Sequence, residues 1–143
     1  MKLREVMSKQ VVRIHPQENV AVAARMLTNY NIGALPVWGS DGRLCGMVTD
    51  RDIVTRCLAA GKNPAATEVG AVMTPRLIVG RPDMDVGIAA GLMGREQIRR
   101  LPVMENGKLC GMVSLGDLAV QEETCMDAGD ALTEISSGLS SRN

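Results

Sequence analysis

Leu44-Cys45-Gly46-Met47-Val48 recurs unchanged, 65 positions later, as Leu109-Cys110-Gly111-Met112-Val113. Two further matches precede it at an offset of 66 residues: Leu35-Pro36-Val37 with Leu101-Pro102-Val103, and Val6-Met7-Ser8 with Val72-Met73-Thr74. A repeat of this length is too long for a solenoid unit and short for an independent domain. We therefore expect two halves that share one core, with a cleft between them where a ligand binds.

The composition is that of a globular domain without a nucleic-acid partner. The 143 residues are 45% hydrophobic, and a chain of this size buries roughly two thirds of its unfolded surface. The formal net charge is zero, and Tyr30 and Trp38 are the only aromatic residues. Neither a basic face that follows phosphates nor a platform for stacking bases is therefore expected.

The sequence favours a cytoplasmic protein with no membrane partner. The N-terminus lacks the apolar stretch of a signal peptide, and no apolar run approaches membrane-spanning length. None of the four cysteines, Cys45, Cys57, Cys110 and Cys125, has C-x-x-C spacing. In a reducing compartment they are interpreted as small buried hydrophobic residues and no metal site is expected. The alternative is a metal site or redox switch formed by the cysteines with His15.

The first repeat is interpreted as strand, helix, strand, strand, helix. Its predicted elements are a strand at 11–14, a helix capped by Asn19 and ending at 31–33, hairpin strands at 34–38 and 44–48, and a helix capped by Thr49 and ending at Gly61. Proline cannot continue a ladder, so the first strand should end at His15-Pro16. Asp41-Gly42 supplies the backbone angles of a hairpin turn.

The second repeat follows the same order. Its predicted elements are a strand at 77–79, a helix at about 84–95, hairpin strands at 101–104 and 109–113, and a helix that begins at Ser114. Its first helix contains Gly87, Gly91 and Gly94, each costing roughly 1 kcal/mol against alanine. This small face should pack against a partner helix, for example from a second subunit; compositional drift is the alternative. The acidic tail should form one short helix at 131–135 and then fray.

These repeated motifs closely resemble the paired cystathionine-β-synthase (CBS) module. The matches are Val-Met-[Ser/Thr] before the first strand, Ile32-Gly33-Ala34-Leu35-Pro36-Val37 with Ile98-Arg99-Arg100-Leu101-Pro102-Val103, and Gly46-Met47-Val48-Thr49-x-x-Asp52 with Gly111-Met112-Val113-Ser114-x-x-Asp117. They cover nearly all of residues 3–120. The resemblance implies an α/β (α+β) fold of tandem repeats with internal pseudo-twofold symmetry, in which packed sheets are flanked by helices.

The resemblance also implies a regulatory module. Members of the family commonly bind adenine nucleotides or related adenosyl ligands in the clefts between repeats, and commonly form flat dimers. In the family pattern the acidic residue of the Thr/Ser-x-x-Asp motif holds the ribose hydroxyls, and the residues before the Leu-Pro-Val strand contact base or phosphate. The implied ligand-binding residues are Thr49 and Asp52 with Ile32, Gly33 and Ala34, and Ser114 and Asp117 with Ile98, Arg99 and Arg100.

Physical chemistry supports two interpretations of the Thr/Ser-x-x-Asp motifs. A carboxylate can accept hydrogen bonds from both hydroxyls of a vicinal diol, as the ligand role requires. The same spacing is that of a helix capping box, in which the acidic side chain at the third helical position turns back to the cap. Within the repeated pattern we favour the ligand role.

The two halves differ at one informative position. Gly33-Ala34 in the first repeat corresponds to Arg99-Arg100 in the second. Arginine suits phosphate because its planar fork donates two parallel hydrogen bonds, so the second repeat should hold the tighter nucleotide site. Alternatively, the two arginines are surface charges paired with Glu96 or Glu105.

The sequence does not favour an enzyme. His15 is the one histidine, it lies in an expected turn beside Pro16, and no nucleophile is near it in sequence. The phosphate-binding, zinc-protease and dinucleotide-binding motifs are also missing from the sequence.

The sequence thus predicts a stand-alone regulatory module that needs no cofactor. It should form a homodimer, bind AMP, ADP, ATP or S-adenosylmethionine as a regulatory ligand, and signal through its dimer geometry to an unidentified effector protein. The expected divisions are repeat 1 at 1–65, repeat 2 at 66–121 and a tail at 122–143. The alternatives are an interaction or stress-response scaffold with degenerate clefts, and the cysteine and histidine switch.

Overall fold

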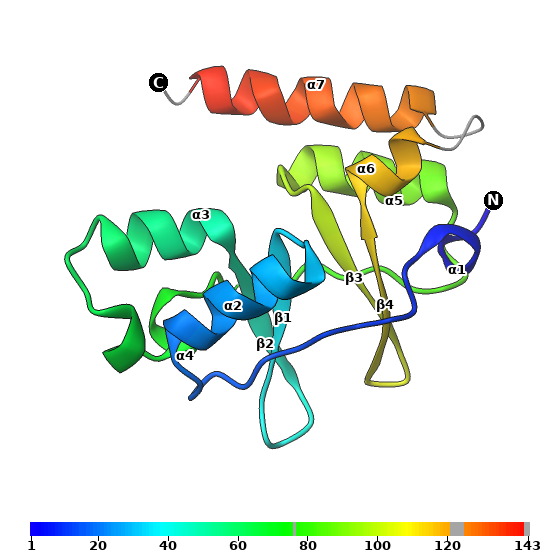
Figure 1. The fold of residues 1–143 in the computed structure, drawn as a ribbon. Helices are drawn as coiled ribbons and strands as arrows, with labels where there is room; N and C mark the ends of the chain where they lie inside the picture. The colour runs from blue at the N-terminus through cyan, green and yellow to red at the C-terminus, as the bar shows by residue number, and fades with distance from the viewer. Residues whose placement is uncertain (76, 121–124, 142–143) are drawn as a thin grey trace. The chain divides into compact units, whose positions relative to one another are not determined.

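The computed structural model describes residues 1–75, 77–120 and 125–141 (Figure 1). Its contacts divide the chain into two compact units. The first-hairpin unit is Val12–Leu77, and the second-hairpin unit joins Met1–Val11 to Ile78–Asn143. Each unit contains a two-stranded antiparallel sheet and several helices, so the expected mixed α/β class is confirmed.

The first-hairpin unit follows the predicted order closely. Its elements are α2 (Val20–Tyr30), β1 (Ala34–Trp38), β2 (Leu44–Thr49), α3 (Asp50–Asp52), the π-helix η1 (Ile53–Leu58), the 3-10 helix η2 (Pro64–Ala66) and α4 (Val69–Val72). Asn19 caps α2 by accepting a hydrogen bond from the Val22 amide at 3.0 Å, and α2 ends at Asn31, which is left-handed with φ 52°. The predicted cap and end of this helix are both confirmed.

The second-hairpin unit repeats the pattern and adds a helix. Its elements are α1 (Leu3–Val6), α5 (Val86–Glu96), β3 (Arg100–Glu105), β4 (Lys108–Ser114), α6 (Leu115–Ala119) and α7 (Cys125–Ser141). No helix in the described parts of the chain combines the length and apolarity needed to cross a membrane.

Both predicted hairpins are present. Leu35 pairs with Val48 in the first, and Leu101 pairs with Val113 in the second. The second turn has positive φ angles at both Asn106 and Gly107, the arrangement that matches the twist of hairpin strands. The hairpins are therefore specified locally, by short apolar runs and by the turn residues between them.

The strands predicted at 11–14 and 77–79 are wrong. Ile14 forms a single parallel bridge to Val37, whereas residues 77–79 form none and the equivalent bridge is made by the next residue, Gly80, to Val103. Turns that begin at His15 and Arg81, closed by hydrogen bonds from Glu18 and Met84, stop the pairing after the bridge residue. Residues 11–13 and 77–79 form no bridge, so neither segment is a strand.

Each hairpin pairs with the segment that opens the other repeat. Ser8, in the N-terminal arm (residues 1–11), exchanges two backbone hydrogen bonds with Met112 at 2.8 and 3.0 Å. Thr74, in the middle arm (residues 67–77), does the same with Met47 at 2.7 and 2.9 Å. The structural units are thus offset from the sequence repeats by the exchange of these arms.

A glycine in each hairpin makes this pairing possible. A Cβ at Gly46 would lie 2.3 Å from the Thr74 carbonyl oxygen, and one at Gly111 would lie 2.6 Å from the Met7 sulfur and 3.0 Å from the Ser8 carbonyl oxygen. Any larger side chain would therefore push the arm away from the strand. This explains the glycine at the centre of the repeated five-residue motif.

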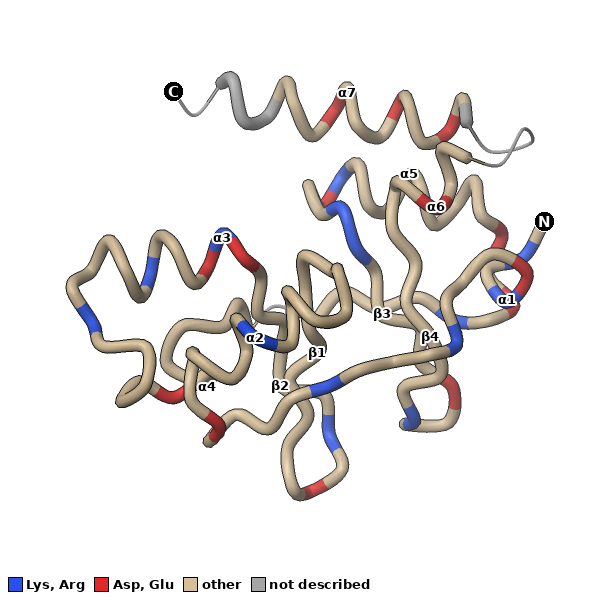
Figure 2. The backbone as a smooth tube through the Cα atoms, viewed as in Figure 1, with Lys and Arg blue, Asp and Glu red and all other residues tan. Residues whose placement is uncertain are grey.

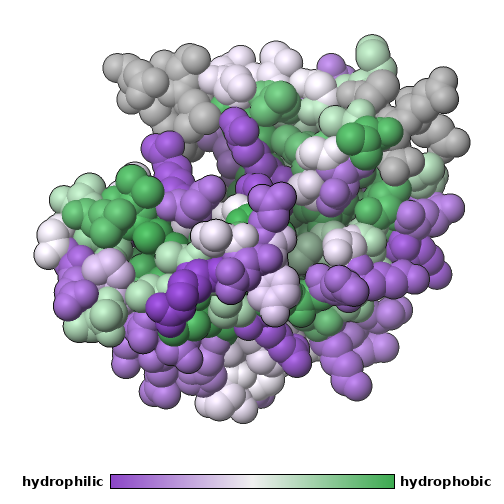
Figure 3. Space-filling view, in the orientation of Figure 1, coloured by the Kyte–Doolittle hydropathy of each residue, from purple (hydrophilic) through white to green (hydrophobic). Residues whose placement is uncertain are grey.

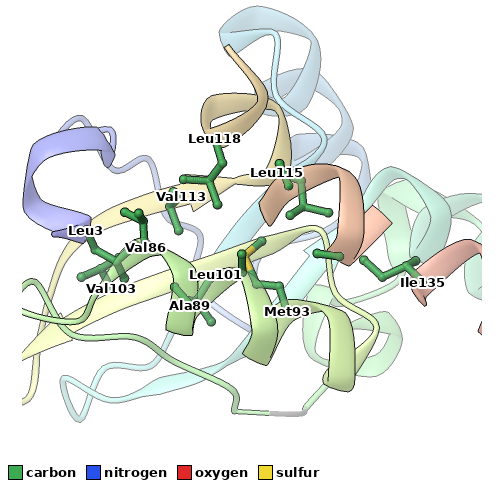
Figure 4. Close-up of a cluster of buried hydrophobic side chains, with 13 residues drawn as sticks. Leu3, Val86, Ala89, Met93, Leu101, Val103, Val113, Leu115, Leu118 and Ile135 are labelled. Atoms are coloured by element: carbon green, nitrogen blue, oxygen red, sulfur yellow. The ribbon is translucent and has the colours of Figure 1, made fainter. Parts of the chain in front are cut away.

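Each unit has a hydrophobic cluster of its own, where the sequence led us to expect one core shared by both halves. In the second-hairpin unit α1, α5, α6, α7 and both strands contribute to the cluster (Figure 4). Its buried members include Leu3, Met93, Leu101 and Leu118. In the first-hairpin unit the cluster includes Leu35 and Val69, which belongs to the middle arm. The exchanged arms are therefore part of each core.

The expected short helix and frayed tail are replaced by α7, a 17-residue helix that lies along α5 and α6 (Figure 1). A Cβ at Gly94 of α5 would lie 3.3 Å from the Ala131 Cα and even closer to the Glu134 carboxylate. The predicted partner helix for the glycine face is therefore α7 of the same chain. Residues 121–124, 142 and 143 lie outside the described residues.

We predict that Gly46→Ala lowers the urea midpoint of unfolding, by an amount equivalent to about 1–3 kcal/mol. The reason is that the new methyl group meets the Thr74 backbone, which cannot rotate away as a side chain can. The control is Gly129→Ala in α7, where a Cβ meets nothing within 4 Å and helix propensity should add up to about 1 kcal/mol. Equal midpoints for Gly46→Ala and wild type would contradict the role assigned to this glycine.

Candidate ligand-binding site

The two Thr/Ser-x-x-Asp motifs both form reciprocal capping boxes. The Thr49 hydroxyl accepts the Asp52 amide at 3.0 Å, and the Asp52 carboxylate accepts the Thr49 amide at 3.0 Å. The corresponding distances are 3.0 and 2.9 Å for Ser114 and Asp117. The capping interpretation is thus confirmed in both repeats, while the ligand role of these residues stays a prediction.

Asp52 is engaged by two further groups of its own unit, the Thr74 hydroxyl and the Arg56 guanidinium. Its side chain is buried, the Thr74 hydroxyl donates to it at 3.2 Å, and Arg56 Nε lies 3.8 Å from Oδ1. Arg56 also donates to the Met73 carbonyl at 3.0 Å. Asp52 therefore holds the middle arm against the start of α3, and a ribose hydroxyl would have to compete with these groups.

Asp117 occupies the equivalent position but is less constrained. Asp117 is half-buried. The residue of the N-terminal arm that corresponds to Thr74 is Ser8, which is exposed. In the described part of the chain no hydrogen bond joins Ser8 to Asp117, and the counterpart of Arg56, Gln121, lies outside the described residues. The Asp117 carboxylate thus keeps more acceptor capacity for an incoming group than Asp52 does.

The residues before each Leu-Pro-Val strand lie beside the start of the following helix. The Gly33 carbonyl accepts the Asp50 amide at 3.0 Å, and the Arg99 carbonyl accepts the Leu115 amide at 3.0 Å. In the first repeat, Ile32 is exposed and Ala34 is buried. In the second, Ile98 packs partly against the core. The structure therefore brings together the segments that the sequence singled out.

A pocket of about 570 Å³ lies at this point of the second-hairpin unit. Its lining includes three residues predicted from the sequence, Arg99, Arg100 and Ser114. The other lining residues come from α6 and α7: Leu115, Gly116, Ala119, Ala128, Gly129 and Leu132. Sequence reasoning missed the α7 residues because the tail was expected to fray. Lys and Arg also colour the backbone where α5 passes into β3 (Figure 2).

The electrostatics of this pocket suit an anion. Among the described residues neither Arg99 nor Arg100 forms an ion pair, so the alternative that they pair with Glu105 has no support. Most of the remaining lining is apolar. Guanidinium groups beside an apolar wall can bind a ligand that has an anionic part and a flat, weakly polar part.

The cysteines give little support to a metal or redox switch. Burial raises the pKa of the Cys110 thiol, and the Glu105 carboxylate adds to the effect. The thiol donates to the Val103 carbonyl at 3.2 Å. Metal binding and disulfide exchange need the thiolate, which is scarce at neutral pH when the pKa is raised. Within residues 1–75, 77–120 and 125–141, no three His, Cys, Asp or Glu side chains are grouped to hold a metal ion.

We predict that Asp52→Asn destabilises the protein more than Asp117→Asn. The amide is nearly the same size, but its nitrogen cannot accept hydrogen bonds and it carries no charge for Arg56, so the loss should be about 1–3 kcal/mol. Thermal and urea unfolding of both variants would measure it. A greater loss for Asp117→Asn would contradict the structural role assigned to Asp52.

Comparisons with known proteins agree with the fold and the motifs. The family model described as CBS domain matches residues 3–59 and 69–121. The CBS domain-containing protein YhcV of Bacillus subtilis is 42% identical over 134 residues, which are 94% of each chain. Hypoxic response protein 1 of Mycobacterium tuberculosis is 34% identical over 116 residues, 81% of each chain.

Solved structures resemble the chain at the level of the whole repeat pair. The crystal structure of Hypoxic Response Protein I with two coordinated zinc ions has a TM-score of 0.76 at 34% identity, covering 83% of this chain and 97% of that one. The CBS domain pair of protein MJ0100, in complex with 5′-methylthioadenosine and S-adenosyl-L-methionine, also has a TM-score of 0.76, at 27% identity, covering 83% and 93%. The chain therefore belongs to the CBS domain family and contains two copies of the domain.

Proposed function

We propose that this CBS domain pair is a regulatory module that binds an adenine nucleotide in the pocket of the second-hairpin unit. The observation that carries the proposal is the pair Arg99 and Arg100, which line this pocket without an ion-pair partner among the described residues. Two guanidinium groups can share the charge of a phosphate chain. A related domain pair in complex with adenosyl ligands supports the same ligand class.

The arginines also discriminate among adenosyl ligands. S-adenosylmethionine carries a sulfonium and an ammonium cation against a single carboxylate, so its net charge is positive and two neighbouring guanidinium groups disfavour it relative to an anion. AMP, ADP and ATP carry the opposite charge in that region of the molecule. We therefore favour the phosphate-bearing nucleotides over S-adenosylmethionine for this pocket.

The proposed roles follow from the chemistry of each side chain; Asp117 and Ile98 do not themselves line the pocket but are adjacent in sequence to the lining residues Gly116 and Arg99. Arg99 and Arg100 hold the phosphates, and Asp117 with Ser114 holds the ribose hydroxyls beside them. Ile98 precedes the arginines and packs partly on the core, so it supports the pocket. Thr49, Asp52 and residues 32–34 form at most a weaker site, because the carboxylate is already engaged and no arginine replaces Gly33-Ala34.

The regulatory part of the proposal rests on population shift. A bound nucleotide can change the protein only by binding one arrangement of it better than another. The arrangement would be read by a second copy of the chain and then by an unidentified effector protein. No residue of the proposed site is assigned a catalytic role.

A scaffold function is the second candidate, and exposed apolar side chains favour it. Hydrophobic atoms gather over η1 of the first-hairpin unit (Figure 3). Val54 and Leu58 are each 55% exposed there. Such a patch commonly marks a protein interface. It serves equally well for the predicted homodimer, which stays a prediction.

We predict that AMP, ADP or ATP raises the melting temperature of the protein. The double variant Arg99→Gln/Arg100→Gln should bind these nucleotides at least about tenfold more weakly, because each charge-assisted hydrogen bond contributes roughly 1.5–3 kcal/mol. Calorimetric titration would measure the affinities. Arg43→Gln, on the exposed turn of the first hairpin, is the matched control and should bind as wild type does. Unshifted melting with the whole panel at millimolar concentration would favour the scaffold function.

We also predict that the protein sediments as a dimer and that Val54→Gln/Leu58→Gln shifts it toward monomer, because the variant removes apolar contact area from the η1 patch. Sedimentation velocity with and without nucleotide would measure both effects. Ile88, 63% exposed on α5, provides the control substitution Ile88→Gln. A monomeric wild type would remove the dimer from the proposal but leave the binding site in place.

A further inference from the structure

Gly129 is a glycine for which the packing of α7 gives no reason. A Cβ at this position would meet nothing within 4 Å, whereas one at Gly94 would press against Ala131. Glycine in a helix interior is less favourable than alanine. The position lines the pocket that contains Arg99 and Arg100. The glycine at position 129 therefore leaves open space at the wall of that pocket.

The neighbouring α7 residues make this wall apolar. Ala128 is buried, while Leu132 lines the pocket and remains 42% exposed. When a ligand covers a large apolar side chain that is partly exposed in a pocket, the burial of apolar surface stabilises the complex. Leu132 and Gly129 together form a shallow apolar surface in the pocket that contains Arg99 and Arg100.

The docking of α7 does not depend on these pocket residues alone. Ala128, Ala131 and Ile135 are each 3% exposed or less, and they join the hydrophobic cluster of the second-hairpin unit. The helix is thus held in position by one face while the adjacent face borders the pocket. A substitution at Gly129 or Leu132 can therefore alter the pocket and leave the core intact.

We propose that α7 is part of the nucleotide site, with Gly129 and Leu132 seating the adenine base while Arg99 and Arg100 hold the phosphates. This inference rests on the proposed function, because it assigns a further element to the same pocket. Gly129 sets the space available to the base, and Leu132 supplies its apolar contact. Both are specificity-determining residues contributed by a helix that lies outside the two segments matched by the family model.

A reciprocal effect follows from the same contacts. If α7 contributes to nucleotide affinity, bound nucleotide must stabilise the docked position of α7 by the same free energy. Amide hydrogen exchange in residues 125–141 should therefore slow when ATP binds. Exchange in the middle of α2, which lies in the other unit, serves as the internal reference.

The test compares methionine substitutions at two small residues of α7. Gly129→Met should lower the affinity for ATP at least about tenfold, because the side chain fills the space of the base. Ser137→Met is the matched control, since Ser137 is exposed and does not line the pocket. Leu132→Ala should lower the affinity by a smaller factor, about threefold to tenfold. Circular dichroism would verify that each variant keeps its helix content.

The outcomes separate this inference from the proposed function. Failure of wild type to bind AMP, ADP or ATP would overturn both. Binding that is weakened by Arg99→Gln/Arg100→Gln but unchanged by Gly129→Met and Leu132→Ala would overturn the role of α7 and leave the nucleotide site intact. Weakening by both sets of substitutions, with wild-type affinity for Ser137→Met and slower exchange in α7, would support the inference.

Discussion

The backbone pairing of an arm with the glycine of a hairpin is the constraint on which the structure depends. Gly46 and Gly111 let the chain at Thr74 and Ser8 approach closely enough to exchange two hydrogen bonds with the following methionine. Without this approach, the apolar residues of each arm would not reach the core they complete, and Thr74 would not reach Asp52. In the first-hairpin unit, the missing Cβ at Gly46 therefore determines both how the unit closes and how Asp52 is held.

The same framework carries two sites with different chemistry. Both helices after the hairpins begin with a capping box, and both preceding loops contact the helix start through a carbonyl. In the first repeat the acidic residue is then used to bind the middle arm, and the loop before the strand is Gly33-Ala34. In the second repeat the loop provides two arginines and the carboxylate is partly exposed. The acidic residue of the first repeat thus stabilises the fold, and under the proposed function that of the second is free to bind a ligand.

Local features of the fold were predictable from the sequence, and long-range features were not. The hairpins, the Asn19 cap and the capping boxes depend on residues within a few positions of one another, which a sequence pattern records. The sequence does not reveal the exchange of arms, because the residues of each arm match either hairpin equally well. The strands predicted at 11–14 and 77–79 did not form, because only Ile14 and Gly80 pair with a hairpin and the residues before them form no bridge. The arginine pair was found by comparing the repeats, whereas α7 was missed because the acidic residues and the serine-rich end of the chain suggested a frayed tail.

The energetics of α7 explain why such a weak-looking helix can be both ordered and responsive. Its described packing face is Ala128, Ala131 and Ile135, and only the isoleucine is large, so burial contributes about 1.5–3 kcal/mol from that side chain and less from each alanine. A ligand at one hundred times its dissociation constant adds about 2.7 kcal/mol to whatever state binds it. Because these two quantities are comparable, a nucleotide that contacts α7 can change how firmly the helix is docked. A helix docked by a large apolar face would respond less to the same ligand, so under the proposed function the small packing residues of α7 suit it to ligand-dependent docking.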